Sequence, residues 1–173
     1  MNFYSGFSLK DDNSFFKEYR DDTLYSISGF SYGAILAFKE VQKRLQENKR
    51  VDKLQLFSPA FFQTKTTKFK KLQMLGFTKD KENYIEKFLQ LCFAPYSMDS
   101  VTLGDPTKEQ LEELLYYEWS GAELLELEEQ GVVIEVYLGG QDAIIDVKSA
   151  REFFVEFSTV TYIKDANHFL QTS

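Results

Sequence analysis

A β-prone run, a glycine-flanked serine and an apolar stretch with helical spacing follow one another in Thr23-Leu24-Tyr25-Ser26-Ile27-Ser28-Gly29-Phe30-Ser31-Tyr32-Gly33-Ala34-Ile35-Leu36-Ala37-Phe38-Lys39-Glu40-Val41. This order predicts a strand over 23–28, a tight turn, and a helix over 32–47. Gly29 and Gly33 let the chain turn sharply, so that the hydroxyl of Ser31 stands clear of the backbone. A serine at the apex of a strand–turn–helix is typical of a nucleophile exposed at the end of a sheet.

Strands and helices alternate through the rest of the chain. Strands are predicted at 3–4, 53–57, 132–138 and 159–163, and further helices at 11–19, 65–75, 81–93, 107–118, 120–130 and 147–157. This alternation favours a single α/β domain over 1–173, with a mainly parallel sheet of about five strands covered by helices on both faces. A parallel crossover needs only one helix, so the helical block at about 62–130 predicts an insertion that lies over the site as a lid.

The charge of the chain is unevenly distributed. The net charge of −7 argues against nucleic acid as the default partner. Residues 39–87 hold 13 basic and 6 acidic side chains, whereas 99–135 hold 11 acidic side chains and one lysine. The basic third either forms a docking face for an acidic partner or is one of two solvated helical faces of opposite charge.

Two rare residue types limit the chemistry. The single cysteine, Cys92, excludes an internal disulfide and a cysteine-based metal cluster. With one histidine and no phosphate-binding glycine loop, we expect neither metal nor cofactor.

No segment approaches the roughly 20 apolar residues of a membrane span, and Met1 to Gly6 lacks the pattern of a signal peptide, so we expect a cytoplasmic protein with no membrane partner.

Three residues follow predicted strands in the order serine, aspartate, histidine. Asp142 lies in the turn after the strand at 132–138, and His168 follows the last strand. Since parallel strands end at one edge of a sheet, we expect both residues to meet Ser31 there. His168 would activate the Ser31 hydroxyl while Asp142 orients the imidazole. Asp146 and Asp165 remain alternative partners for the histidine.

Backbone amides are the expected donors to the negative charge that develops during such a reaction. The first is the amide of Tyr32, the residue after the nucleophile, and the second is the amide of Phe7, with Gly6 permitting close approach. The alternative interpretation of Ser5-Gly6-Phe7 is an ordinary glycine turn.

These segments together resemble the α/β-hydrolase superfamily, and more narrowly the short pimeloyl-acyl carrier protein methyl ester esterases of biotin synthesis (BioV type). The matching segments span nearly the whole chain and are Phe3-Tyr4-Ser5-Gly6-Phe7, Ser28-Gly29-Phe30-Ser31-Tyr32-Gly33-Ala34-Ile35, Leu56-Phe57-Ser58-Pro59, Phe69-Lys70-Lys71-Leu72-Gln73, Ile134-Glu135-Val136-Tyr137-Leu138-Gly139 with Asp142, and Asn167-His168-Phe169-Leu170-Gln171. The chain is shorter than most of the superfamily, and Ser5-Gly6-Phe7 stands where a His-Gly dipeptide is usual.

The resemblance implies a reduced α/β-hydrolase fold with a helical lid, and release of methanol from a pimeloyl methyl ester carried by an acyl carrier protein. It also implies that basic residues of the lid meet the acidic carrier; the candidates are Lys65, Lys68, Lys70 and Lys71, and further Lys79, Lys81 and Lys87. Two alternatives remain open, namely another thioesterase or small-ester carboxylesterase, and a catalytically inert hydrolase-fold protein that binds acyl groups or acidic partners.

Overall fold

The central feature of the computed structural model, which describes residues 2–173, is a parallel five-stranded sheet of order β1-β3-β4-β6-β7. Met1, part of the amino-terminal segment discussed above, lies outside the described residues. The strands are β1 (Phe3–Tyr4), β3 (Ser26–Phe30), β4 (Lys53–Phe57), β6 (Val133–Gly139) and β7 (Thr159–Ile163). The predicted parallel sheet is therefore confirmed, and a two-residue antiparallel ribbon of β2 (Leu9–Lys10) and β5 (Thr102–Leu103) accompanies it.

The register brings the carboxyl ends of the strands to one edge. Phe30 pairs with Phe57, and Phe57 pairs with Tyr137 on the other side. Gly139 pairs with Ile163 at the end of β7. The loops that carry Ser31, Asp142 and His168 all leave the sheet from this edge, as the order of motifs predicts.

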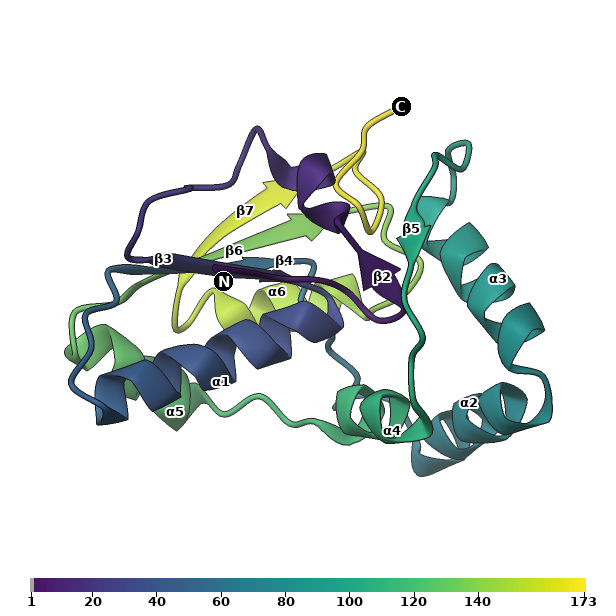
Figure 1. Cartoon of the computed structure of the whole chain (residues 1–173), viewed down its shortest axis with the longest axis horizontal. Helices are drawn as coiled ribbons and strands as arrows, with labels where there is room; N and C mark the ends of the chain where they lie inside the picture. Colours follow the sequence, from purple (N-terminus) through teal and green to yellow (C-terminus); the bar gives the residue numbers. More distant parts are fainter. Residues whose placement is uncertain (1) are drawn as a thin grey trace.

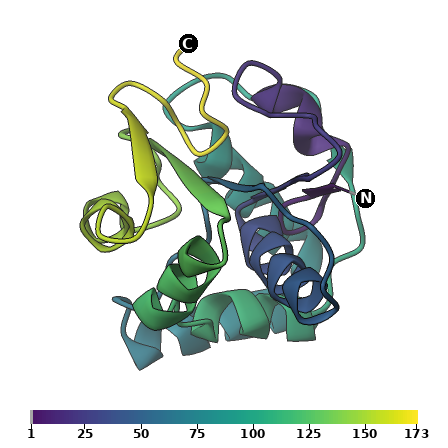
Figure 2. The ribbon, with the colours of Figure 1, turned by 90° about the vertical axis from the view of Figure 1, so that its left-hand side faces the viewer.

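The α-helices that pack on the sheet within residues 2–173 all lie on one face, so the predicted helical cover of the other face is reduced to a single 3₁₀ helix. The face below the sheet in Figure 1 carries α1 (Tyr32–Gln46), α5 (Gly121–Glu129) and α6 (Val147–Phe154), and Figure 2 shows the same layer from the side. The opposite face carries the short 3₁₀ helix η1 (Asp12–Phe16), the segment before β3 and the carboxyl-terminal loop. Side chains alternate along a strand, so the helical face is apolar while the other face is divided between phenylalanines and polar groups.

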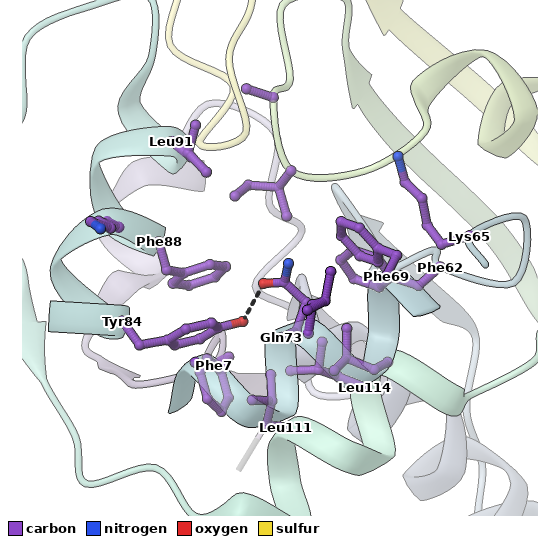
Figure 3. Close-up of a pocket in the computed structure, with 16 residues that line it drawn as sticks. Phe7, Phe62, Lys65, Phe69, Gln73, Tyr84, Phe88, Leu91, Leu111 and Leu114 are labelled. Atoms are coloured by element: carbon purple, nitrogen blue, oxygen red, sulfur yellow. Dashed lines mark hydrogen bonds between the residues drawn. The ribbon is translucent and has the colours of Figure 1, made fainter. Parts of the chain in front are cut away.

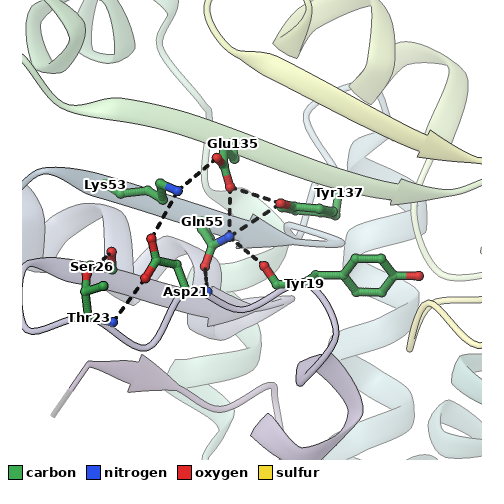
Figure 4. A network of polar contacts seen from close by, with 8 residues as sticks. All are labelled: Tyr19, Asp21, Thr23, Ser26, Lys53, Gln55, Glu135 and Tyr137. Carbon is green, nitrogen blue, oxygen red and sulfur yellow. Dashed lines mark hydrogen bonds and ion pairs between the residues drawn. The ribbon is translucent and has the colours of Figure 1, made fainter.

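A polar network replaces an apolar cover on part of the face that carries η1 (Figure 4). The buried Gln55 side chain accepts a hydrogen bond from the Asp21 amide at 2.7 Å and donates to the Tyr19 carbonyl and Glu135, each at 2.8 Å. Lys53 lies between the carboxylates of Asp21 and Glu135, at 3.1 and 3.2 Å. These contacts satisfy the buried amide and hold the segment before β3 against the sheet.

The insertion between β4 and β6 holds four helices, of which α2 (Thr67–Lys79), α3 (Lys81–Phe93) and α4 (Lys108–Tyr116) extend beyond the carboxyl edge (Figure 1). The fourth, α5, buries Leu124 and Leu127 in the same core as α1. The projecting part therefore ends before α5, which serves as the crossover helix to β6. Within residues 2–173, no helix is both long and apolar enough to cross a bilayer.

Several element boundaries differ from the sequence prediction. The strand before the serine begins at Ser26 and reaches Phe30, because Thr23 to Tyr25 form a turn closed by the Ser26 amide on the Thr23 carbonyl. The first helix of the insertion continues through Gly76 to Lys79, since Asp80 is the residue that caps the next helix. The helices predicted at 11–19, 107–118 and 147–157 are shorter, spanning Asp12–Phe16, Lys108–Tyr116 and Val147–Phe154.

Candidate active site

Ser31 occupies a strained turn between β3 and α1. Its backbone angles are φ 54° and ψ −114°, a region that non-glycine residues rarely adopt, and its amide donates to the Phe57 carbonyl at 2.9 Å. The glycines on either side are required by close packing. A Cβ on Gly29 would lie 2.1 Å from the Gly33 carbonyl oxygen, and one on Gly33 would lie 2.0 Å from the Tyr4 carbonyl oxygen. The motif therefore holds β1, β3 and α1 together around the serine.

The structure brings the three sequence-predicted residues into one hydrogen-bonded chain. His168 Nε2 lies 3.0 Å from Ser31 Oγ, and His168 Nδ1 lies 2.5 Å from Asp142 Oδ2. The side chains of His168 and Asp142 are fully buried. Because the Asp142 carboxylate accepts a hydrogen bond from the N–H at His168 Nδ1, the favoured tautomer leaves Nε2 as a base directed at the serine hydroxyl.

Asp142 is itself fixed by backbone amides. Its Oδ1 accepts hydrogen bonds from the amides of Ile144 at 2.7 Å and Ile145 at 3.2 Å, which leaves Oδ2 for the imidazole. The two other candidate carboxylates do not bond to His168 anywhere in the described chain. Asp146 caps α6 by accepting from the Ser149 amide and hydroxyl, and the Ser149 hydrogen bond lowers the pKa of Asp146. Asp165 is exposed to solvent.

The histidine loop has two further supports that the sequence did not reveal. Ser58 Oγ donates to the His168 carbonyl at 2.7 Å, and Ser58 adopts φ 42° directly after β4. The Asn167 side chain donates to the Phe93 carbonyl at 2.9 Å and accepts from the Gln171 amide at 3.0 Å. In the sequence, Ser58 is recognisable as a polar residue directly after a predicted strand. That pattern indicates the end of the strand and does not indicate a contact with the histidine loop.

The amides of Phe7 and Tyr32 are free to donate to a ligand. Neither N–H has an acceptor within residues 2–173, although the Gly6 amide beside them donates to Asp12 Oδ2 at 2.9 Å. The Gly33 contact places this loop against the elbow, because a Cβ there would also lie 2.5 Å from the Ser5 carbonyl oxygen. Two unengaged amides, one in the loop after β1 and one directly after the buried serine, are the donors that an oxyanion hole would need.

Asp12 holds the loop at an electrostatic cost that depends on pH. The residue is 2% exposed, its Oδ1 has no partner within the described chain, and burial raises the pKa of its carboxyl. A raised folded-state pKa means that the folded chain retains the proton longer than the unfolded chain as pH rises. Burial of Asp12 therefore lowers the free energy of unfolding as the pH rises above the ordinary pKa of an aspartate carboxyl.

We expect Asp12→Asn to remove this cost. Measured by urea unfolding from pH 4 to pH 7, the variant should gain stability relative to the parent as pH rises, because only the parent ionises the buried group. A difference between the two proteins that stays constant over this range, or that falls with pH, would contradict the assignment.

A cavity of about 410 Å³ lies between the projecting helices and the sheet edge (Figure 3). Its walls are mainly aromatic and aliphatic. They include Phe62 in the loop before α2, Phe69 on α2, Phe88 on α3 and Leu111 on α4. Two of its lining residues lie near the three site residues along the chain or through contacts: Phe7 follows Gly6, and the amide of Ile144 donates to Asp142. Ser31 itself does not line the cavity and is only 4% exposed.

The four basic residues expected on the insertion occupy different environments. Lys68 and Lys71 are exposed on α2, and Lys65 lines the cavity with Nζ 5.3 Å from the Phe69 ring centre. Lys70 departs from the expectation, because it is 8% exposed and its Nζ lies 5.2 Å from the centre of the Tyr116 ring on α4. It packs α2 against α4 instead of facing solvent.

Solved structures share this architecture. No protein-family model matches the chain, and no curated protein is similar to it in sequence. Naproxen esterase from Bacillus subtilis is 23% identical, with 84% of this chain and 54% of that one aligned at a TM-score of 0.54. Carboxylesterase CesB from the same organism is 17% identical, with coverages of 84% and 54% and a TM-score of 0.53.

A third structure matches over most of both chains. BioG from Haemophilus influenzae is 11% identical, with 97% of this chain and 87% of that one aligned at a TM-score of 0.59. The chain thus spans about half the length of the two Bacillus esterases and nearly the length of BioG. Together with the parallel sheet and the serine elbow, these likenesses show that the chain has an α/β-hydrolase fold in reduced form.

Proposed function

We propose that this protein is a serine ester hydrolase, with Ser31, His168 and Asp142 as its catalytic residues. The observation that carries the proposal is the buried hydrogen-bonded chain from Ser31 Oγ through His168 to Asp142. His168 Nε2 takes the hydroxyl proton as Ser31 Oγ attacks the ester carbonyl, and Asp142 stabilises the imidazolium that results. The amides of Phe7 and Tyr32 donate to the carbonyl oxygen as it becomes negative.

The remaining steps return the enzyme to its starting state. The tetrahedral intermediate collapses, and His168 gives its proton to the leaving alkoxide, which departs as the alcohol. A water molecule, deprotonated by His168, then attacks the acyl-enzyme and releases the carboxylic acid with Ser31 restored. Ser31 is only 4% exposed, so substrate entry needs some movement around the serine, and we propose that the projecting helices move as a lid.

The substrate that we propose is the methyl ester of pimeloyl-acyl carrier protein. An apolar cavity of about 410 Å³, lined in part by Ile144 close to Asp142, suits an aliphatic acyl chain. Lys68 and Lys71 provide exposed positive charge on α2, which forms part of the cavity wall. An acidic carrier protein would be attracted to this surface. A small-molecule carboxylesterase is the second candidate, since two of the similar structures are named as carboxylesterases.

Charge reversal on α2 tests whether a carrier protein docks there. We expect Lys68→Glu with Lys71→Glu to lower kcat/KM for the carrier-bound methyl ester roughly tenfold at low salt, while a free methyl ester is hydrolysed as before. The difference should shrink as ionic strength rises. Lys43→Glu, an exposed reversal far along α1, is the matched control. Equal loss on both substrates would contradict docking on α2.

A further inference from the structure

An uncharged polar pair interrupts the apolar wall of the cavity. Tyr84 on α3 donates its hydroxyl hydrogen bond to Gln73 Oε1 on α2 at 2.9 Å (Figure 3). Both side chains line the cavity, and the Tyr84 ring is further held edge-on by Phe77, with ring centres 5.7 Å apart. The pair therefore joins the two helices and has a defined position in the cavity wall.

The contact with Tyr84 determines which end of the Gln73 amide faces the cavity. Burial raises the pKa of Tyr84 to about 12, so the phenol keeps its proton near neutral pH and acts as the donor to Oε1. The amide nitrogen then carries two N–H donors that have no acceptor within residues 2–173. Figure 3 shows this nitrogen directed into the space between Phe88 and Phe69.

We propose that Gln73, held by Tyr84, is a specificity-determining residue that donates to a second carbonyl oxygen in the acyl part of the substrate. A plain alkyl chain would cover the amide without replacing its hydrogen bonds to water, which costs free energy. A neutral carbonyl in the same place restores one of these bonds. The site therefore favours acyl groups with a carbonyl at each end over fatty acyl groups of equal length.

The cavity gives such a substrate a path between the two polar positions. Ile144, whose amide fixes Asp142, and Phe7, beside the proposed oxyanion hole, line the cavity together with Gln73. An ester at Ser31 would extend its chain from Phe7 and Ile144 towards α2 and α3. This inference rests on the proposed function, since it assigns the second recognition point of the same substrate.

The test compares two methyl esters of equal backbone length, dimethyl heptanedioate and methyl nonanoate. Binding is measured to the full chain carrying Ser31→Ala, which separates recognition from turnover. We expect the diester to bind about five- to tenfold more tightly than the monoester. Adding Gln73→Leu should remove this preference, Tyr84→Phe should reduce it, and Gln90→Leu, on the exposed side of α3, should leave it unchanged.

The outcomes separate the two proposals. Equal binding of the two esters, or a preference that survives Gln73→Leu, would overturn the role of Gln73 whether or not the parent is an enzyme. Failure of the parent to hydrolyse either ester, with the binding preference intact, would overturn the proposed function and leave the recognition point in place.

Discussion

Ser31→Ala is expected to abolish ester hydrolysis, lowering kcat by at least about 10³-fold while the chain stays folded. The variant keeps the contacts that do not involve Oγ, such as the backbone hydrogen bond from the Ser31 amide to the Phe57 carbonyl. Because alanine is no larger than serine, it also fits the same space. What it loses is the only atom that His168 Nε2 can activate in the described site. Hydrolysis of a small chromogenic methyl-type ester and thermal unfolding measure the two effects.

A nearby serine provides the matched control. Ser28 lies on β3, three residues before the nucleophile, and within residues 2–173 its hydroxyl makes a single long contact of 3.4 Å, to the Asn2 carbonyl. Ser28→Ala should therefore keep its activity. Hydrolysis by Ser31→Ala at more than a tenth of the parental rate would show that the chemistry lies elsewhere.

Asp142→Asn is expected to have the second largest effect, a loss on the order of 10³- to 10⁴-fold in kcat. An asparagine can keep the hydrogen bonds from the Ile144 and Ile145 amides through its oxygen. Its amide nitrogen would then donate to His168 Nδ1, which moves the ring proton to Nε2. That tautomer cannot accept the proton of Ser31, and the imidazolium loses its counter-charge.

Asp146→Asn is the control for this substitution. Asp146 caps α6 and lies four residues from Asp142, but it has no hydrogen bond to His168 within residues 2–173. Its replacement should cost up to about 1 kcal/mol of stability with activity retained. Similar activity losses for the two variants would contradict the assignment of Asp142 as the orienting carboxylate.

The parts of the fold that depend on local sequence patterns could be predicted from the sequence. Strand and helix periodicity predicted the parallel sheet, and the two glycines around Ser31 predicted the elbow because glycine permits a sharp turn. The structure adds that close backbone packing excludes a Cβ at both glycines. The positions of Asp142 and His168 after strand ends predicted that both would reach the serine. Their meeting follows from parallel topology, which brings every strand's carboxyl end to one edge.

Features that depend on contacts between distant segments could not be predicted. The support of His168 by Ser58 joins residues 110 positions apart, and the Gln55–Glu135 bond joins residues 80 apart. Whether Lys70 faces solvent depends on where Tyr116 packs, so its charge alone suggested the wrong environment. The sparse helical cover of the face that holds Gln55 and Glu135 also depends on how distant segments pack, and no local pattern predicts it.

The measurement that tests the account most directly is methanol release from pimeloyl-acyl carrier protein methyl ester by the parent protein, run beside Ser31→Ala. We predict release by the parent, formation of the free carboxylate on the carrier, and no release by the variant. Absence of methanol with a folded parent that still hydrolyses small esters would contradict the proposed substrate. Release by both proteins would contradict Ser31 as the nucleophile.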